Sequence, residues 1–483
     1  MAGKRNKKKN TRKILEEELE IISETEKIKK TKRTRKRKKN KRPYGPKEKA
    51  FIVTSFIFAI LIFLFYGYRS LKYYSRETSN KKTDNATVAS AIINNNKITR
   101  EKDGLRGTKN GYYFSGKVEN NYIKVFNRLY RVVDVINDKV KIVSAENEAS
   151  FIYGNENDYN TSNINKWLNK GEEENTGIYY NTIPGIEKLL VKTEYCDGQL
   201  KDNKVTCSNK KSSEYFSILT IDDYIRAQGK NSYLNDDKYS FILGYDEDGN
   251  PLAKNDQGSV SGVNNTEGFG IRVVMTLKKN TRLASGTGTK EDPYVVNQEG
   301  NDNKINKYVV LGEDKFQIME ENNTTIRLRQ TDYLKYRGNY QEKQFNNKQA
   351  VFATNNSNNI GYFLNKTYLQ SLTYKDILSD CTFNIGEIST ETSFSYLESY
   401  KKQINAKIGL VNMFDLNSDN ALTDYYLINT TSNIGSMVKT HNSLGIIDDD
   451  KSKEKKKIVP VICIDKNLIK SGDGSDSNPY KTE

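Results

Sequence analysis

The chain carries one sequence pattern twice, and this duplication limits the folds that it can adopt. The ten residues SGTGTKEDPY at 285–294 and SGDGSDSNPY at 471–480 are identical at five positions and lie 186 residues apart. The same shift relates Tyr122 to Tyr308. INKWLNK at 164–170 resembles IGYFLNK at 360–366 with a shift of 196, which indicates an insertion in the second copy. Units of this size bury their own cores, so we expect two domains and not a solenoid.

We place the two domains at 106–298 and 303–483. Each copy opens with residues that alternate between apolar and polar, as in 121–145, where Asn137-Asp138 predicts a hairpin turn. A helix is expected around Trp167, which recurs as Phe363 and is predicted to lie in the core. A strand leading into a helix follows at 218–228, where Thr220 or Asp222 would cap the helix. Strands and helices that do not alternate regularly favour an α+β fold with antiparallel sheet.

Both copies end in a glycine-rich turn. No Lys-Ser/Thr pair follows these glycines, and an apolar strand instead of a helix comes next, so a phosphate-binding loop is excluded. We therefore predict structural turns. The residues that build them are Gly286, Gly288, Pro293 and Tyr294 in the first copy, and Gly472, Gly474, Pro479 and Tyr480 in the second.

Several of these segments together resemble a known family. The segments are NYIKVFNRLYRVV at 121–133, WLN at 167–169, SILTIDDY at 217–224, GIRVVMTL at 270–277 and the closing SGTGTKEDPY. The order resembles a family of uncharacterised surface proteins from low-GC Gram-positive bacteria and mollicutes. Its pattern runs NYIKFNNxLWRIV, GVRPVxxL, SGDGTxxxPY.

The resemblance implies a fold but no activity. Its domain is similar in layout to C-type-lectin-like and formylglycine-generating-enzyme-like folds. The family's Trp is Tyr130 here and its Pro is Val273, whereas the second copy keeps Pro460 but loses the preceding Gly-Arg. The sugar-binding triplets of calcium-dependent lectins are absent. The family has no assigned activity, so the resemblance gives no residue a catalytic role.

The charge of the chain is concentrated at its N-terminus. The chain has 77 Lys and Arg against 61 Asp and Glu, a net charge of +16. Residues 1–49 hold 21 of the basic and 7 of the acidic residues, or +14, which leaves about +2 for the rest. The folded part therefore has no global field that would attract nucleic acid, which is not expected as a partner.

An uncharged run follows this basic tail. Residues 50–68 read AFIVTSFIFAILIFLFYGY, and a helix of this length matches a hydrocarbon core of about 30 Å. The sequence thus predicts one transmembrane helix, an uncleaved signal anchor. The positive-inside rule places the basic, disordered tail in the cytoplasm, against anionic lipid. Residues 69–105 would form a stalk, and the domains beyond it would lie outside the cell.

Four cysteines and one histidine restrict the chemistry. Cys196 and Cys207 flank a short hairpin and are predicted to form a disulfide, with two free thiols as the alternative. Cys381 aligns with Cys196. A disulfide between Cys381 and Cys463 is the weaker candidate, and two unpaired core cysteines are favoured over it. The single histidine, His441, excludes His-based zinc sites and is expected on a surface or loop.

Asp246, Asp248 and Asn250 in YDEDGNPL have the spacing of a calcium loop. However, the glycine is misplaced and no bidentate Glu follows, so a plain β-turn is favoured over a metal site. No other metal and no cofactor is expected.

These observations lead to one functional hypothesis and two alternatives. The first is a non-enzymatic, membrane-anchored cell-surface protein whose two domains bind an extracellular ligand, a glycan or wall polymer, or another protein. The second is an extracellular enzyme of the formylglycine-generating type or a carboxylate hydrolase. The third is a membrane scaffold that acts through its basic cytoplasmic tail.

Overall fold

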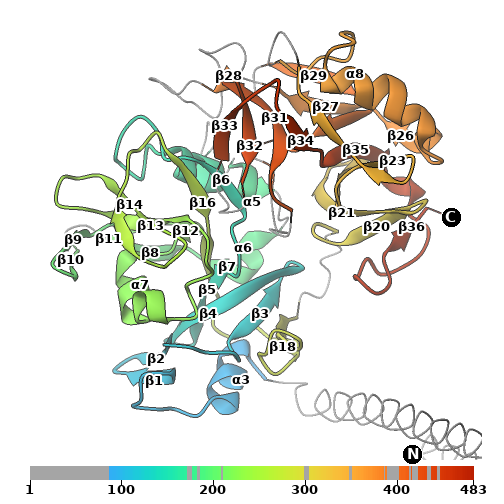
Figure 1. Cartoon of the computed structure of the whole chain (residues 1–483). Coiled ribbons are helices and arrows are strands. Elements are labelled where there is room, and N and C mark those ends of the chain that lie inside the picture. Colours follow the sequence, from blue (N-terminus) through green and yellow to red (C-terminus); the bar gives the residue numbers. More distant parts are fainter. Residues whose placement is uncertain are drawn as a thin grey trace, which may run out of the picture. The chain divides into compact units, whose positions relative to one another are not determined.

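The computed structural model describes most of the chain beyond residue 85. The described residues are 86–170, 177–181, 185–207, 210–297, 304–346, 351–385, 387–388, 402–412, 415, 422–431, 437–442 and 447–482. Of these, 43% are strand and 15% helix, so the protein is mostly β (Figure 1). The predicted mixed α+β class is wrong. The expected helices are only one or two turns long, and much of the chain between them forms short strands.

The membrane prediction is also corrected. Among the described residues, no helix is both long enough and apolar enough to cross a bilayer. The longest single α-helix is α3 (Val88–Asn95) with 8 residues, and the longest continuous helical run, 360–371, rises only about 18 Å. The transmembrane, single-pass and signal-anchor assignments, and the cell-membrane location with extracellular domains, are therefore not supported. The run 50–68 and the tail 1–49 lie outside the described residues. Within the predicted stalk, α3 buries Val88 and Ile92.

The first copy is built on a curved sheet of ten strands. Its main path runs β12-β17-β5-β4-β3-β19-β18, with β7 beside β17, β2 beside β4, and β1 beside β2. The strands are β1 (Gly104–Thr108), β2 (Gly111–Ser115), β3 (Tyr122–Val125), β4 (Arg128–Ile136), β5 (Lys139–Ser144), β7 (Leu190–Val191), β12 (Phe216–Ile218), β17 (Val273–Leu277), β18 (Leu283–Ser285) and β19 (Tyr294–Val296). The predicted turn at Asn137-Asp138 joins β4 to β5, and both of its residues have positive φ.

The second copy repeats this sheet. Its path is β26-β35-β22-β21-β20-β36, with β30 in the place of β12. The strands are β20 (Tyr308–Leu311), β21 (Asp314–Glu321), β22 (Thr325–Gln330), β26 (Leu378–Ser379), β30 (Ile408–Leu410), β35 (Pro460–Asp465) and β36 (Tyr480–Lys481).

The two sheets agree in register and in irregularities. Tyr294 pairs with Ile123, and Tyr480 pairs with Val309, so both partners move by 186. A bulge interrupts β4 between Val132 and Asp134, and a bulge interrupts β21 between Ile318 and Glu320. Bulges fix register and aim side chains. Equivalent positions can therefore be compared directly.

Smaller sheets complete each copy. The first has the order β10-β9-β13-β14-β15, with β16 joining β13 to β6, and a separate ribbon β8-β11; the second has β25-β34-β31-β32-β33, with β28 beside β31, and the ribbons β27-β29 and β23-β24. Their bounds are β6 (Ala149–Ile152), β8 (Thr193–Cys196), β9 (Gln199–Lys201), β10 (Lys204–Thr206), β11 (Lys210–Glu214), β13 (Ser240–Tyr245), β14 (Pro251–Lys254), β15 (Val260–Gly262), β16 (Gly268–Ile271), β23 (Lys335–Tyr336), β24 (Asn339–Tyr340), β25 (Glu342–Gln344), β27 (Cys381–Asn384), β28 (Glu387–Ile388), β29 (Gln403–Ala406), β31 (Tyr425–Thr431), β32 (Met437–His441), β33 (Ile447–Lys451) and β34 (Lys455–Lys457).

The helices beyond α3 are short. They are α4 (Asn163–Asn165), which continues into the π-turn η2 (Lys166–Lys170), α5 (Ile178–Asn181), α6 (Ile186–Leu189), α7 (Ile221–Arg226), η3 (Gly229–Asn231), α8 (Ile360–Tyr362), which continues into η4 (Phe363–Tyr368), η5 (Leu369–Ser371), η6 (Lys375–Ile377) and η7 (Lys466–Leu468). The predicted cap of α7 is Thr220, whose hydroxyl accepts from the Asp223 N–H. Trp167 is fully buried, as predicted.

An asparagine in each π-turn ties helix to sheet. Asn169 Nδ2 donates to the Phe216 carbonyl at 2.9 Å, and its Oδ1 accepts from the Phe216 N–H at 3.1 Å. Asn365 makes the same pair of bonds to Ile408, at 2.8 and 3.1 Å. The repeated Leu-Asn of the sequence is therefore an amide clamp on the strand that begins the strand-to-helix unit.

The prediction for His441 is wrong. It lies in β32, is 4% exposed, and stacks on the Tyr425 ring with centroids 5.2 Å apart. Burial is the main reason that the pKa of His441 is lowered to about 4. The imidazole is thus neutral near pH 7 and behaves as a core residue.

Candidate functional site

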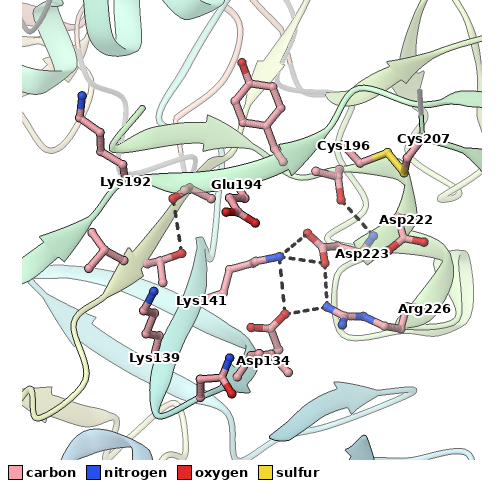
Figure 2. A pocket seen from close by; sticks show the side chains of 17 residues that line it. Asp134, Lys139, Lys141, Lys192, Glu194, Cys196, Cys207, Asp222, Asp223 and Arg226 are labelled. Carbon is pink, nitrogen blue, oxygen red and sulfur yellow. Dashed lines mark hydrogen bonds and ion pairs between the residues drawn. A yellow bond between two sulfur atoms is a disulfide. The ribbon is translucent and has the colours of Figure 1, made fainter. Parts of the chain in front are cut away.

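A polar cleft of about 680 Å³ opens in the first copy (Figure 2). It lies where the β4–β5 hairpin meets the strands β7, β8 and β17 and the start of α7. The Cys196–Cys207 disulfide lines one side of it. We call this cavity the charged cleft, because eight of its lining side chains are ionisable Asp, Glu, Lys or Arg.

The floor of the charged cleft is a square of alternating charges. Asp134 and Lys141 are cross-strand partners just after the β4 bulge, and Asp223 and Arg226 come from α7. Arg226 Nη2 lies 2.7 Å from Asp134 Oδ2 and 2.7 Å from Asp223 Oδ1. Lys141 Nζ lies 3.5 Å from Asp134 Oδ2 and 3.2 Å from Asp223 Oδ2. Each carboxylate therefore faces two cations, as Figure 2 shows.

Burial and charge act in opposite directions on this square. Burial by itself would raise the pKa of Asp223, but Lys141, Arg226 and the Thr220 hydrogen bond lower it overall. Burial would lower the pKa of Lys141, yet the Asp223 and Asp134 carboxylates raise it. The same two acids outweigh burial and raise the pKa of Arg226. All three groups thus stay ionised near neutral pH.

The rim of the cleft carries charged side chains that do not belong to the square of ion pairs on its floor. Lys139, Lys192, Glu194 and Asp222 line the cavity, and within the described part of the chain none of them forms an ion pair. Lys192 Nζ lies 5.9 Å from the centre of the Tyr215 ring. The cleft thus presents two basic and two acidic groups above a neutralised floor.

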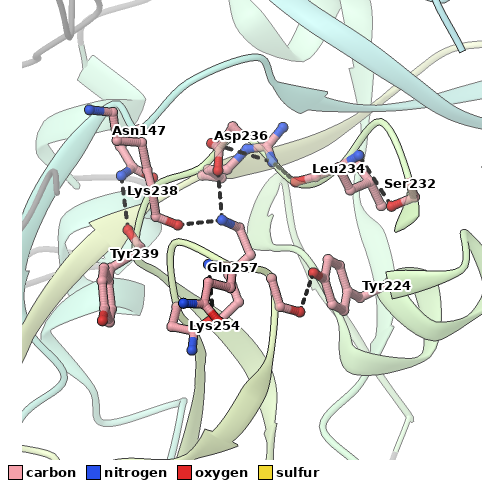
Figure 3. Close-up of polar contacts among 12 residues, drawn as sticks. Asn147, Tyr224, Ser232, Leu234, Asp236, Lys238, Tyr239, Lys254 and Gln257 are labelled. Atoms are coloured by element: carbon pink, nitrogen blue, oxygen red, sulfur yellow. Dashed lines mark hydrogen bonds and ion pairs between the residues drawn. The ribbon is translucent and has the colours of Figure 1, made fainter. Parts of the chain in front are cut away.

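A second polar network lies inside the first copy (Figure 3). Lys254 is 1% exposed and its Nζ lies 2.6 Å from Asp236 Oδ1. Arg272, from the GIR segment of the sequence, donates from Nε to the Ser144 carbonyl at 2.9 Å and from Nη1 to the Leu234 carbonyl at 2.5 Å. Burial lowers the pKa of Lys254, and Asp236 only partly opposes this. These bonds fix the loop before β13.

The structure joins the four cysteines in two pairs. Cys196 and Cys207 are 11 residues apart with Cα atoms at 5.6 Å, and Cys381 and Cys463 are 82 residues apart with Cα atoms at 5.5 Å. However, the alignment of Cys381 with Cys196 is wrong. Leu190 faces Leu277 and Leu378 faces Ile464, so the first-copy counterpart of Cys381 is Thr193.

The first copy has hydroxyls where the second has this disulfide. Thr193 and Thr276 occupy the positions of Cys381 and Cys463, and Thr193 Oγ1 donates to Thr276 Oγ1 at 3.4 Å. Both threonines line the charged cleft. The same strand contact is thus closed covalently in one copy and by a hydrogen bond in the other.

The calcium candidates form a turn. Asp246 Oδ1 accepts from the backbone N–H groups of Asp248 and Asn250 at 3.0 and 2.8 Å, and Asp246 Oδ2 accepts from Asn250 Nδ2 at 3.0 Å. These bonds are those of an Asx turn. Among the residues that the structure describes, no group of three or more His, Cys, Asp or Glu side chains is placed to hold a metal.

The glycine motifs form matching turns. The Gly288 carbonyl accepts from Tyr122 N–H at 2.7 Å, and the Gly474 carbonyl accepts from Tyr308 N–H at 2.9 Å. A Cβ on Gly288 would lie 2.4 Å from the Tyr294 ring, and one on Gly474 would lie 2.5 Å from the Tyr480 ring. Gly286 and Gly472 have φ of +98° and +90° and abut the carbonyls of Pro293 and Pro479.

Sequence reasoning did not single out Asp134, Lys141, Asp223 or Arg226 as site residues. One signal was available, because Asp134 and Lys141 lie three residues before and after the Asn137-Asp138 turn. Opposite charges at such positions face each other across a hairpin. Comparison with family models, with curated proteins and with solved structures gives no match for this chain. The resemblance to the surface-protein family stays a prediction.

Proposed function

We propose that this chain is a non-catalytic binding protein whose charged cleft takes a peptide segment carrying both acidic and basic side chains. The observation that carries the proposal is the contrast between floor and rim. The floor charges neutralise one another, whereas Lys139, Lys192, Glu194 and Asp222 stand at the opening. A ligand of mixed charge can pair with the rim without breaking the floor.

The chemistry of the cleft favours binding over catalysis. A general acid or base works best with a pKa near the operating pH. The pKa of Asp223 is lowered by two cations, which moves this carboxyl away from that range. The cysteines that line the cleft are joined in a disulfide, so neither offers the thiolate that a formylglycine-generating type of enzyme would need.

The two disulfides support a role in an oxidising compartment, where such bonds persist. A scaffold acting through the basic tail is the remaining alternative. Its tail lies outside the described residues, so the cleft is the better-supported binding element.

Fluorescence polarisation of a labelled peptide of alternating Lys and Glu, with both ends blocked, tests the proposal. The variant Lys139→Glu/Lys192→Glu reverses both basic groups of the rim. The control Lys279→Glu/Lys290→Glu makes the same charge change at exposed positions of the same copy, outside the cleft. We expect the first variant to bind at least about tenfold more weakly, and the control to bind within about twofold of the wild type.

Two results would count against a peptide ligand. One is equal weakening by both double variants, which would mean that binding follows net charge alone. The other is saturable binding of an acidic wall polysaccharide, and not of the peptide, in the same assay. The second outcome would keep a binding function and replace the ligand class.

A further inference from the structure

The first copy has a second cavity, whose lining is dominated by side-chain amides. It has a volume of about 480 Å³ and lies at the start of β14, the end of β15 and the loop that leads into β16 (Figure 1). This volume is within the range of small-molecule sites. Four of the seven described residues that line it are asparagines, and the other three are Gly262, Val263 and Glu267. We call it the asparagine cavity, and it shares no described lining residue with the charged cleft.

The Asp246 turn holds one wall of the asparagine cavity. Asn250 donates its N–H to Asp246 Oδ1 at 2.8 Å and its side-chain Nδ2 to Asp246 Oδ2 at 3.0 Å. A Cβ on Gly262 would overlap this Oδ2, so the strand beside the turn has room only for glycine there. Because the nitrogen of the Asn250 amide is committed, its Oδ1 is presented as an acceptor, and no described residue donates to it.

The loop from β15 to β16 presents a donor. Asn264 Oδ1 accepts from the Thr266 N–H at 3.0 Å and from the Thr266 hydroxyl at 2.9 Å. The Asn264 Nδ2 donates to no described residue. The Asn265 carbonyl accepts from the Gly154 N–H at 3.2 Å, which ties this loop to the segment after β6. The loop is therefore held in place while the Asn264 nitrogen stays available.

Three further side chains of the lining have no partner in the described part of the chain. They are the amides of Asn157 and Asn265, which are half-buried, and the carboxylate of Glu267, which is exposed. Each amide offers an acceptor and two donors, and a half-buried amide gains when a ligand restores the hydrogen bonds that it has lost. Among the described lining residues there is no Lys or Arg, so Glu267 gives the cavity its charge.

We infer that the asparagine cavity binds a neutral sugar unit. A hydroxyl both donates and accepts, so neighbouring hydroxyls of a sugar ring match a lining in which fixed acceptors and donors lie side by side. Glu267 accepts from hydroxyls and repels an anion, and no basic group stands there to offset that repulsion. Val263 offers an apolar surface to the C–H groups of the ring. The inference concerns a separate cavity and does not rest on the peptide proposed for the charged cleft.

A bound metal is not needed to hold the sugar. Calcium takes six to eight oxygen ligands, several of them usually carboxylates. Only one carboxylate is present among the described lining residues, and the described part of the chain has no group of three or more His, Cys, Asp or Glu placed to hold a metal. The hydrogen bonds of the amides are therefore expected to carry the binding.

The test uses the full chain and the methyl glycosides of glucose, galactose, mannose and N-acetylglucosamine, followed by saturation-transfer NMR and titration calorimetry. Methyl glucuronide is the matched anionic probe, because it keeps the glucose ring and carries a carboxylate in place of the hydroxymethyl group. Each titration is repeated in EDTA, which separates amide-held sugar from metal-held sugar.

The variant Asn157→Ala/Asn265→Ala removes two amides that hold no partner in the described fold, so its circular dichroism should match that of the wild type. The control Asn94→Ala/Asn358→Ala makes the same change at two exposed asparagines outside the cavity. We expect saturable binding of at least one neutral glycoside, unchanged by EDTA. The first variant should bind it at least about tenfold more weakly, and the control within about twofold of the wild type. Glu267→Gln, at an exposed position, should also weaken this binding, because a carboxylate accepts hydrogen bonds more strongly than an amide.

The inference would be overturned if no neutral glycoside bound saturably, if the two double variants bound alike, or if the glucuronide bound as tightly as the neutral sugars. Loss of binding in EDTA would overturn it too, because a metal would then hold the sugar. Lys139→Glu/Lys192→Glu should leave the sugar titrations unchanged. A failure of the peptide proposal and a failure of the asparagine cavity therefore give different results.

Discussion

The amide clamp of Asn169 offers the sharpest test of how the fold is held together. Replacing Asn169 with Ala removes both bonds to Phe216 and the bond to Asn165 Oδ1, which measure 2.9, 3.1 and 3.0 Å. Asn169 is 2% exposed and Phe216 is fully buried, so water cannot replace the lost partners without opening the core.

The magnitude follows from the groups left without partners. A buried backbone N–H or carbonyl that loses its hydrogen bond costs about 1–3 kcal/mol. Two such groups, on Phe216, give a range of about 2–6 kcal/mol. We expect about 3 kcal/mol, because the helix end can shift slightly toward the strand. Asn365→Ala should cost less, since Asn365 is only half-buried.

Urea unfolding followed by tryptophan fluorescence measures this loss directly. Trp167 is the only tryptophan and lies in the core of the first copy, so its emission reports on that copy. Asn94→Ala, an exposed change in α3, is the control and should stay within about 0.5 kcal/mol. A loss below about 1 kcal/mol for Asn169→Ala would refute the reasoning, because it would show that the clamp is not needed to satisfy the strand.

Three further predictions concern the turn, the strand contact and the buried histidine. In thermal unfolding, Gly288→Ala should destabilise the chain by more than about 2 kcal/mol, and Gly249→Ala by about 1 kcal/mol. Both glycines have positive φ, but only a Cβ on Gly288 would meet other atoms. Thr193→Cys/Thr276→Cys should form a third disulfide without reorganisation, seen as no free thiol by mass spectrometry; two free thiols in the oxidised, folded protein would contradict the register. His441 is the only histidine, and its pKa falls from 6.5 to about 4 on folding, so the unfolded chain takes up a proton first as the pH drops. The free energy of unfolding should fall by about 3 kcal/mol between pH 6.5 and 4. In urea titrations, His441→Phe should make this fall smaller, and the same pH dependence in the variant and the wild type would refute the prediction.

The local patterns that could be read from the sequence are those set by neighbours in the chain. The Asn137-Asp138 turn, the Thr220 cap and the burial of Trp167 follow from residue type and spacing within a few positions. The shift of 186 also holds residue by residue where β19 pairs with β3 and β36 pairs with β20. These features depend on local geometry, which single-sequence reasoning captures well.

The fold class could not be read in the same way. Short apolar runs such as 240–245 fit a strand or a buried helix turn equally well, and tertiary pairing decides between them. Here pairing made them strands, and the protein is mostly β. Cys381 was aligned with the wrong residue for a related reason. Cys381 and Cys196 were matched because both are cysteines, whereas the strand pairing matches Cys381 to Thr193.

The charged cleft and the long-range ion pairs depend on contacts that sequence spacing does not encode. Arg226 reaches Asp134 across 92 positions, and Arg327 reaches Asp415 across 88. No sequence motif marks either ion pair, and a charged residue in a predicted hairpin is usually expected to face solvent. The buried state of His441 was equally invisible, because the strand that holds it is short and flanked by polar residues.

The two copies keep one backbone and vary the side chains that it carries. The features that set backbone position are kept in both, namely the amide clamp, the glycine turn and the strand bulge. The features that vary are side chains around the charged square, where Thr193 and Thr276 become Cys381 and Cys463. In the second copy a disulfide joins β27 to β35, where the first copy has the hydrogen bond between Thr193 and Thr276. A covalent cross-link closes this strand contact more firmly than a single hydrogen bond does, so the two copies hold the same backbone frame by different side-chain chemistry.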